Sequence, residues 1–151
     1  MSEFKSALSE WMHKNGIDCG IKMSDEFAYN KENNILLIAT ERDEEVELLS
    51  EQFFYEYGAD YVGYGFFVLG LLHEIGHHFT MSCFDEIDLL IYQLNKDLFL
   101  DGESIYERAF NYWEVPDEFA ANIWAINFIN HHTAAVDELA NIFNKEFCHV
   151  Y

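Results

Sequence analysis

The sequence predicts an α+β protein in which helices dominate and a small β-sheet lies near the N-terminus. Apolar residues recur every three or four positions along most of the chain, and short apolar segments beside turn-forming residues occur between residues 17 and 40. One Pro and 8 Gly in 151 residues indicate few elaborate loops. Half of the residues are apolar, so we expect one core and a single domain over residues 1–151.

The first 40 residues contain one predicted helix and the predicted sheet. Gly16 is a plausible stop for the helix, and the strands are expected over residues 17–23 and 34–40, with a shorter one at 27–29. The apolar face of this helix is formed by Phe4, Leu8, Trp11 and Met12.

Helices are predicted for most of the chain after residue 40. Pro116 suits the first position of a helix, and Thr133 suits an N-cap. One expected helix covers residues 44–57, and the next begins near residue 60 and continues into His73. A further helix is marked by the apolar residues Ile87, Leu90, Ile91, Leu94 and Leu98. The last three are expected over residues 104–112, over residues 116–130 and from Thr133 onward.

The charge of the chain is strongly negative, with 28 acidic and 8 basic residues and a formal net charge of −20. Such a field repels nucleic acid and anionic membranes, because binding to either depends on Lys and Arg. Direct nucleic-acid binding and membrane association are therefore not expected. An acidic surface that favours solubility, a basic protein partner and mimicry of a nucleic acid all remain compatible with this charge.

The cysteines and the N-terminus predict a cytoplasmic protein. Cys19, Cys83 and Cys148 are odd in number and lack paired spacing, so we expect reduced thiols rather than disulfides. No basic region followed by an apolar run opens the chain, and the longest apolar stretch, residues 61–72, is too short to span a bilayer.

The segment His73-Glu74-Ile75-Gly76-His77 is the most informative part of the sequence. His73 and His77 are four residues apart, so on a helix their rings project from one face and can bind the same Zn²⁺. Glu74 points about 100° round the helix from His73, where it can act as a general base on water at the metal. This is the HExxH arrangement of zinc metallopeptidases. Gly76 would let substrate or another backbone approach closely.

Glu118 is the best candidate for the third metal ligand. A catalytic zinc site takes three protein ligands and leaves one position open. Asn122 lies four residues after Glu118, on the same helix face, and can accept a hydrogen bond from the outer ring nitrogen of His73 or His77. The small residues Ala120, Ala121 and Ala125 would let the two helices come close together.

These two segments resemble the ImmA/IrrE-like metallopeptidases, which share an HExxH helix and a downstream Glu-x-x-Ala-Asn-x-aromatic-Ala helix. The second pattern is matched by residues 118–125. The resemblance implies a zincin-like domain, a gluzincin-like zinc site with Glu118 as third ligand, and cleavage of a partner repressor, often one encoded on a mobile genetic element. A basic DNA-binding repressor would suit the acidic surface as a substrate.

Two other functions stay open at this stage. One is a non-enzymatic acidic protein that binds a DNA-binding partner by mimicking nucleic-acid charge, and the other is a metal-binding relic without a substrate cleft.

An oxyanion donor is also needed for peptide hydrolysis. Four tyrosines are candidates, and the sequence does not choose among Tyr61, Tyr64, Tyr106 and Tyr112.

Overall fold

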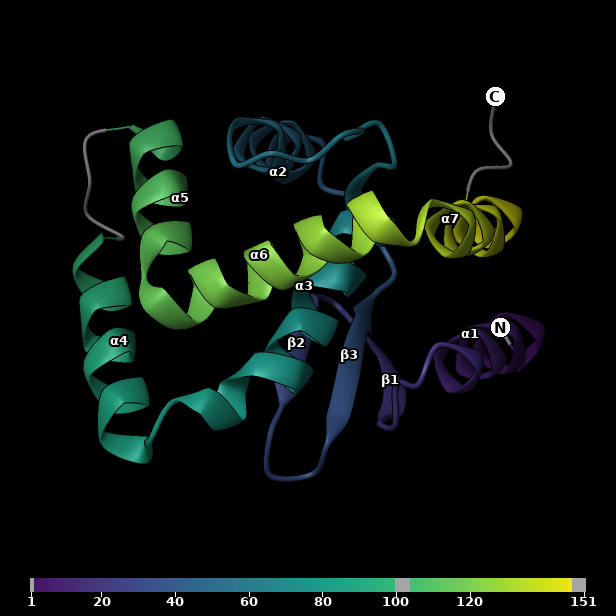
Figure 1. Cartoon of the computed structure of the whole chain (residues 1–151), viewed down its shortest axis with the longest axis horizontal. Coiled ribbons are helices and arrows are strands. Elements are labelled where there is room, and N and C mark those ends of the chain that lie inside the picture. Colours follow the sequence, from purple (N-terminus) through teal and green to yellow (C-terminus); the bar gives the residue numbers. More distant parts are fainter. Residues whose placement is uncertain (1, 100–103, 148–151) are drawn as a thin grey trace.

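The computed structural model describes residues 2–99 and 104–147 of the chain, and helices dominate it (Figure 1). The small N-terminal sheet that the sequence predicts is also present. The elements, in chain order, are α1 (Ser2–Lys14), β1 (Gly20–Ser24), β2 (Ala28–Asn30), β3 (Ile35–Ala39), α2 (Glu44–Glu56), α3 (Phe66–Thr80), the 3₁₀ turn η1 (Met81–Cys83), α4 (Glu86–Phe99), α5 (Ile105–Glu114), α6 (Pro116–His131) and α7 (Thr133–Phe147).

The sheet has three strands in the order β1-β3-β2, with β3 in the centre. Strand β1 runs parallel to β3, and β2 runs antiparallel to it. The turn before β3 places Asn34 at φ 53°, a left-handed conformation that Asn tolerates better than most residues. Leu36 and Ile38 on β3 are fully buried, so the central strand supplies the sheet's side of the core.

Helix α3 passes through the middle of the molecule, between the sheet and α6 (Figure 1). It also contacts α2 and α7. Leu71, Leu72 and Ile75 have no exposed surface. A helix that is apolar on most sides must be covered on most sides. The side chains of α3 are therefore held rigidly by their neighbours.

Helix α3 begins at Phe66, about six residues later than the sequence predicts. Gly65, the N-cap, has φ 91°, and Gly58 has φ 102°; both values lie in the left-handed region that a right-handed helix cannot include. The apolar run of residues 61–72 is therefore split between a connecting segment and the helix. Strand β1 likewise begins at Gly20 rather than at residue 17.

The remaining expectations concern cysteines and membrane helices. Cys19 and Cys83 are free thiols, whereas Cys148 lies outside the described residues. Among the helices of the described ranges, none is long and apolar enough to cross a membrane.

Candidate metal centre

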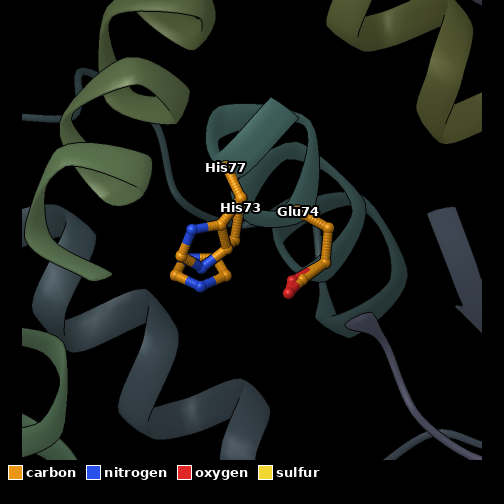
Figure 2. A group of neighbouring side chains, drawn as sticks. All are labelled: His73, Glu74 and His77. Carbon is orange, nitrogen blue, oxygen red and sulfur yellow. The ribbon is translucent and has the colours of Figure 1, made fainter. Parts of the chain in front are cut away.

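The HExxH segment lies on the second half of α3. Figure 2 shows the rings of His73 and His77 and the carboxylate of Glu74 extending from this helix toward the same side. The two ring centroids are 4.7 Å apart. Glu74 and His77 are buried, with 7% and 4% of their surface exposed. One turn of helix therefore brings three polar side chains to a largely dry site.

Glu118 reaches the same place from the start of α6. Pro116 begins this helix, and Glu118 lies in its first turn, where the positive end of the helix dipole stabilises a carboxylate. Glu118 Oε1 is 3.0 Å from His73 Nε2, and its Oε2 is 3.0 Å from His77 Nε2. The two histidines and Glu118 thus converge although 40 residues lie between His77 and Glu118 in the sequence.

Gly76 is where α3 and α6 come closest. A Cβ atom added at Gly76 would lie 2.8 Å from Ala121 Cα, and nearer still to its carbonyl oxygen. Real Cβ contacts are not this short, so only Gly fits here. Ala121 and Ala125 have no exposed surface. The close helix approach that the sequence predicts from these small residues is therefore present, and the neighbouring backbone is that of α6.

Asn122 contacts His73 rather than His77. The amide oxygen Oδ1 of Asn122 accepts a hydrogen bond of 2.6 Å from His73 Nδ1. With Nδ1 bonded to Asn122, Nε2 is the ring nitrogen that faces Glu118; it donates to Glu118 Oε1 at 3.0 Å and would have to lose that hydrogen to bind a metal. His77 Nδ1 is buried and has no hydrogen-bond partner among the described residues.

Lys96 and Asp117 also belong to this centre, although no pattern in the sequence indicates it. Lys96 is 5% exposed, and its Nζ donates to Asp117 Oδ2 at 2.7 Å and to Glu118 Oε2 at 2.9 Å. A buried cation needs anionic partners, and two buried carboxylates so close together need a cation. Lys96 therefore balances part of the negative charge. Lys96 and Asp117 are 21 residues apart and lie on different helices, so no helical spacing in the sequence could predict their contact.

The environment changes the pKa values of these groups in different directions. Burial raises the pKa of Glu74, although His73 and His77 oppose this effect. Burial would also raise the pKa of Glu118, but hydrogen bonds from both histidines outweigh it and hold the pKa well below its usual range. Burial lowers the pKa of His73, yet Glu118 and Glu74 raise it overall to about 9. Glu118 is thus a carboxylate, and Glu74 has a stronger affinity for a proton.

A cavity of about 370 Å³ opens onto this centre, and His73, Glu74 and Glu118 form part of its wall. Glu74 Oε2 has no partner among the described residues. Phe27 packs so closely on Gly70 that its ring occupies the space of a Cβ there. The other residues that line the cavity come from α2, α3, α5, α6 and the loops beside the sheet: Asp25, Glu26, Phe27, Glu41, Asp43, Val46, Ser50, Phe54, Phe66, Leu69, Gly70, Tyr112, Trp113 and Asn122.

Of the four candidate tyrosines, Tyr112 lines this cavity and the other three do not. Tyr64 instead donates to Asp137, and Tyr106 bonds with Gln52. Burial and the nearby carboxylates of Glu118 and Glu74 raise the pKa of Tyr112 above its usual value. Its hydroxyl therefore keeps its proton and can donate a hydrogen bond.

The donor atoms of this centre include groups that could hold a divalent metal. Bonds of about 2.0–2.1 Å in a tetrahedral zinc site place the ligand atoms about 3.3 Å apart. His73 Nε2 is 3.0 Å from Glu118 Oε1 and His77 Nε2 is 3.0 Å from Oε2, so each histidine contacts a different oxygen of the carboxylate at a distance a few tenths of an ångström shorter than this. His73, Glu74 and His77, and likewise His77, Asp117 and Glu118, have donor atoms within 4.8 Å of one another. Two imidazoles and one carboxylate are also ligands that zinc prefers.

Similarity to known proteins gives no further guidance on this centre. Comparisons of the chain with protein-family models, with curated proteins and with solved structures found no match. The function is therefore argued from the residues and their geometry.

Proposed function

We propose that this chain is a zinc-dependent metallopeptidase with a zincin-like, gluzincin-type site, as in the ImmA/IrrE-like enzymes that its sequence resembles. One observation carries the proposal: His73 and His77 each lie 3.0 Å from a carboxylate oxygen of Glu118, beside Glu74 and at the wall of a cavity. His73, His77 and Glu118 would hold the metal.

The reaction that follows from this arrangement is hydrolysis of a peptide bond. Zinc, held by His73, His77 and Glu118, would supply the Lewis acidity that peptide hydrolysis near neutral pH requires. Glu74 takes a proton from the attacking water and passes it to the leaving amine. Tyr112 donates a hydrogen bond to the carbonyl oxygen as negative charge develops there. Asn122 keeps His73 in the tautomer that can bind metal.

The cavity favours a peptide with Lys or Arg near the bond that is cut. Besides Glu74 and Glu118, four of its lining residues are acidic: Asp25 and Glu26 between β1 and β2, and Glu41 and Asp43 between β3 and α2. Asp43 caps α2 through Val46 N–H. Acidic groups around a partly enclosed site attract a cationic side chain. A basic DNA-binding repressor is a substrate of this kind.

Metal content is the first test of this proposal. We expect near-stoichiometric zinc by elemental analysis in the native protein, loss of zinc in His77→Ala and Glu118→Ala, and retention in Glu74→Gln. Glu74→Gln keeps the ligands but removes the proton acceptor, so it should bind zinc without cleaving peptides. A native protein that binds no zinc, even after incubation with the ion, contradicts the proposal.

Peptide preference is the second test. Matched peptide pools that differ only in Lys/Arg against Asp/Glu content should be cleaved unequally, with the basic pool preferred. Glu26→Gln/Glu41→Gln should raise KM for the basic pool more than it changes kcat, because these carboxylates lie away from the reacting bond. Equal cleavage of both pools contradicts the basic preference but leaves the zinc enzyme standing.

The net charge of −20 favours a second candidate, a non-enzymatic acidic protein that binds a DNA-binding partner in place of DNA. Glu74→Gln separates the two functions. It abolishes the function of an enzyme but leaves an acidic mimic intact. Replacing surface carboxylates by amides should have the opposite effects. An acidic mimic would no longer bind its partner, whereas an enzyme would still cleave an uncharged peptide in a zinc-dependent reaction.

A further inference from the structure

Helix α4 turns its apolar side toward solvent. Four large apolar side chains follow one another at helical spacing on it, and each is substantially exposed: Ile87 (71%), Leu90 (62%), Ile91 (48%) and Leu94 (58%). Helical spacing i, i+3, i+4 and i+7 places these four side chains, named here the α4 stripe, on one face. Most globular proteins bury such a stripe, and an exposed apolar patch marks an interaction site.

The opposite side of α4 is the one that faces the protein. At about 100° per residue, Lys96 lies nearly 180° from the centre of the α4 stripe. Lys96 is buried and bonds Asp117 and Glu118 at the start of α6. The helix therefore cannot rotate its stripe inward without breaking a buried ion pair. In Figure 1, α4 forms the edge of the molecule beside α5.

The edges of the α4 stripe are acidic. Helix geometry places Glu86 and Asp97 on one side of the stripe and Asp88 on the other, each roughly 70–110° from its centre. Lys96, the one basic residue on α4, points away from this surface. An apolar strip between two acidic edges is complementary to an apolar strip between basic edges.

A second copy of this chain does not fit this surface. Two copies would bring acidic edges together, and each carries a net charge of −20. Like charges opposed across an interface cost free energy, so the same apolar contact is more favourable with a cationic partner.

We propose that the α4 stripe is a docking surface for an amphipathic helix of a basic partner protein. The partner helix presents Leu- or Ile-type side chains to the stripe and Lys or Arg to Glu86, Asp88 and Asp97. The surface lies outside the candidate metal centre, and none of its four apolar residues lines the cavity of that centre. Docking does not depend on zinc or on peptide cleavage.

A designed helical peptide tests the proposal. The probe is a fluorescein-labelled 18-residue peptide with Leu at i, i+3, i+4 and i+7 spacing and Lys at most other positions, titrated in fluorescence anisotropy at 150 mM NaCl. We expect Leu90→Gln/Leu94→Gln to weaken binding at least tenfold. Leu48→Gln/Tyr55→Gln, which removes two equally exposed apolar side chains from α2, should change it less than twofold. Glu74→Gln should bind as the native protein does.

Three results would overturn this assignment. Equal binding to the native protein and to Leu90→Gln/Leu94→Gln means that only the general negative charge attracts the peptide. If a scrambled Leu/Lys peptide binds equally well, the partner need not be an amphipathic helix. If a Leu/Glu peptide with the same pattern binds equally well, the partner need not be basic. Self-association of the native protein that Leu90→Gln/Leu94→Gln abolishes, measured by sedimentation, assigns the stripe to a second copy instead.

Discussion

At the scale of single residues, the centre depends on one position where two backbones meet. Gly76 on α3 faces the backbone of Ala121 on α6 with no room for a Cβ. This close approach lets His73 and His77 on the HExxH helix reach Glu118 on α6. Gly76 also costs about 1 kcal/mol relative to Ala inside a helix, so the close approach is maintained against local propensity.

We therefore expect Gly76→Ala to destabilise the protein, although Ala is the better helix former. Moving α6 away from the added methyl group should cost about 1–3 kcal/mol in the free energy of unfolding and reduce zinc retention. Urea denaturation followed by circular dichroism measures the first effect, and elemental analysis measures the second. Gly16→Ala is a useful comparison, because an added Cβ there meets no atom within 4 Å and only its φ of 75° is unfavourable. Unchanged zinc content in Gly76→Ala would contradict this account of the helix contact.

Lys96 is a second residue whose role is decided by burial. Lys96→Met keeps most of the side-chain volume but leaves the carboxylates of Asp117 and Glu118 buried without their cation. We expect a loss of about 3–5 kcal/mol in the free energy of unfolding, measured by urea denaturation. The exposed Lys145→Met serves as control and should change stability by less than about 0.5 kcal/mol.

A double-mutant cycle separates the ion pair from the packing of the lysine. If charge imbalance causes the loss, Asp117→Asn should cost less in the Lys96→Met background than in the native protein. Additive losses would show that the Lys96 side chain acts through its apolar stem.

At the scale of elements, helix α3 begins without a cap from its own segment. Gly65 precedes the helix and offers no side-chain acceptor. Glu47 on α2 supplies one instead, because its Oε2 accepts from Phe66 N–H at 2.6 Å. Arg42 also donates to this carboxylate. One buried carboxylate thus ties α2 to the start of the helix that carries the HExxH motif.

This tie makes part of the stability dependent on pH. Burial raises the pKa of Glu47, but the bonds from Arg42 and Phe66 N–H outweigh it, so the folded-state pKa lies below the ordinary value of 4.5. The contribution is therefore present above pH 4.5 and is lost as the pH falls through the folded-state value. We expect Glu47→Gln to lose about 1–2 kcal/mol at pH 7 and less below pH 4. Thermal melts from pH 3.5 to pH 7 measure this, and an equal loss across that range would contradict it.

At the scale of the whole molecule, the net charge of −20 opposes folding. Like charges brought together in a compact state repel one another, and salt screens this repulsion over a Debye length of about 10 Å at 0.1 M. Buried pairs such as Lys96 with Asp117 are screened much less. Because salt weakens the surface repulsion more than it weakens the buried ion pairs, we expect added salt to increase the free energy of unfolding.

Raising NaCl from 20 to 300 mM at pH 7 should therefore increase Tm by several degrees. Differential scanning calorimetry of metal-free and zinc-loaded samples checks this. The rise should appear in both samples, because it comes from surface charge rather than from the metal. A Tm that falls with added salt would show that exposed ion pairs outweigh the general repulsion.

The sequence by itself predicted the helices, apart from the start of α3, and the side chains that meet between α3 and α6. Helix geometry is local, so the spacing of His73 and His77, and of Glu118 and Asn122, is enough to place each pair on one face. The meeting of these two faces, through Gly76, Ala121 and Ala125, could also be predicted from their small side chains. The length of α3 could not, because the backbone conformation at Gly65 interrupts an otherwise continuous apolar run.

Only the tertiary structure decided which residues surround these donors. Tyr112 is the one candidate tyrosine at the cavity, Lys96 balances the buried carboxylates, and α4 faces outward with its apolar stripe. Each of these depends on contacts between segments far apart in the chain, for which periodicity within one segment carries no information. An apolar stripe reveals that a helix is amphipathic, but the side on which its neighbours pack is decided by the whole molecule.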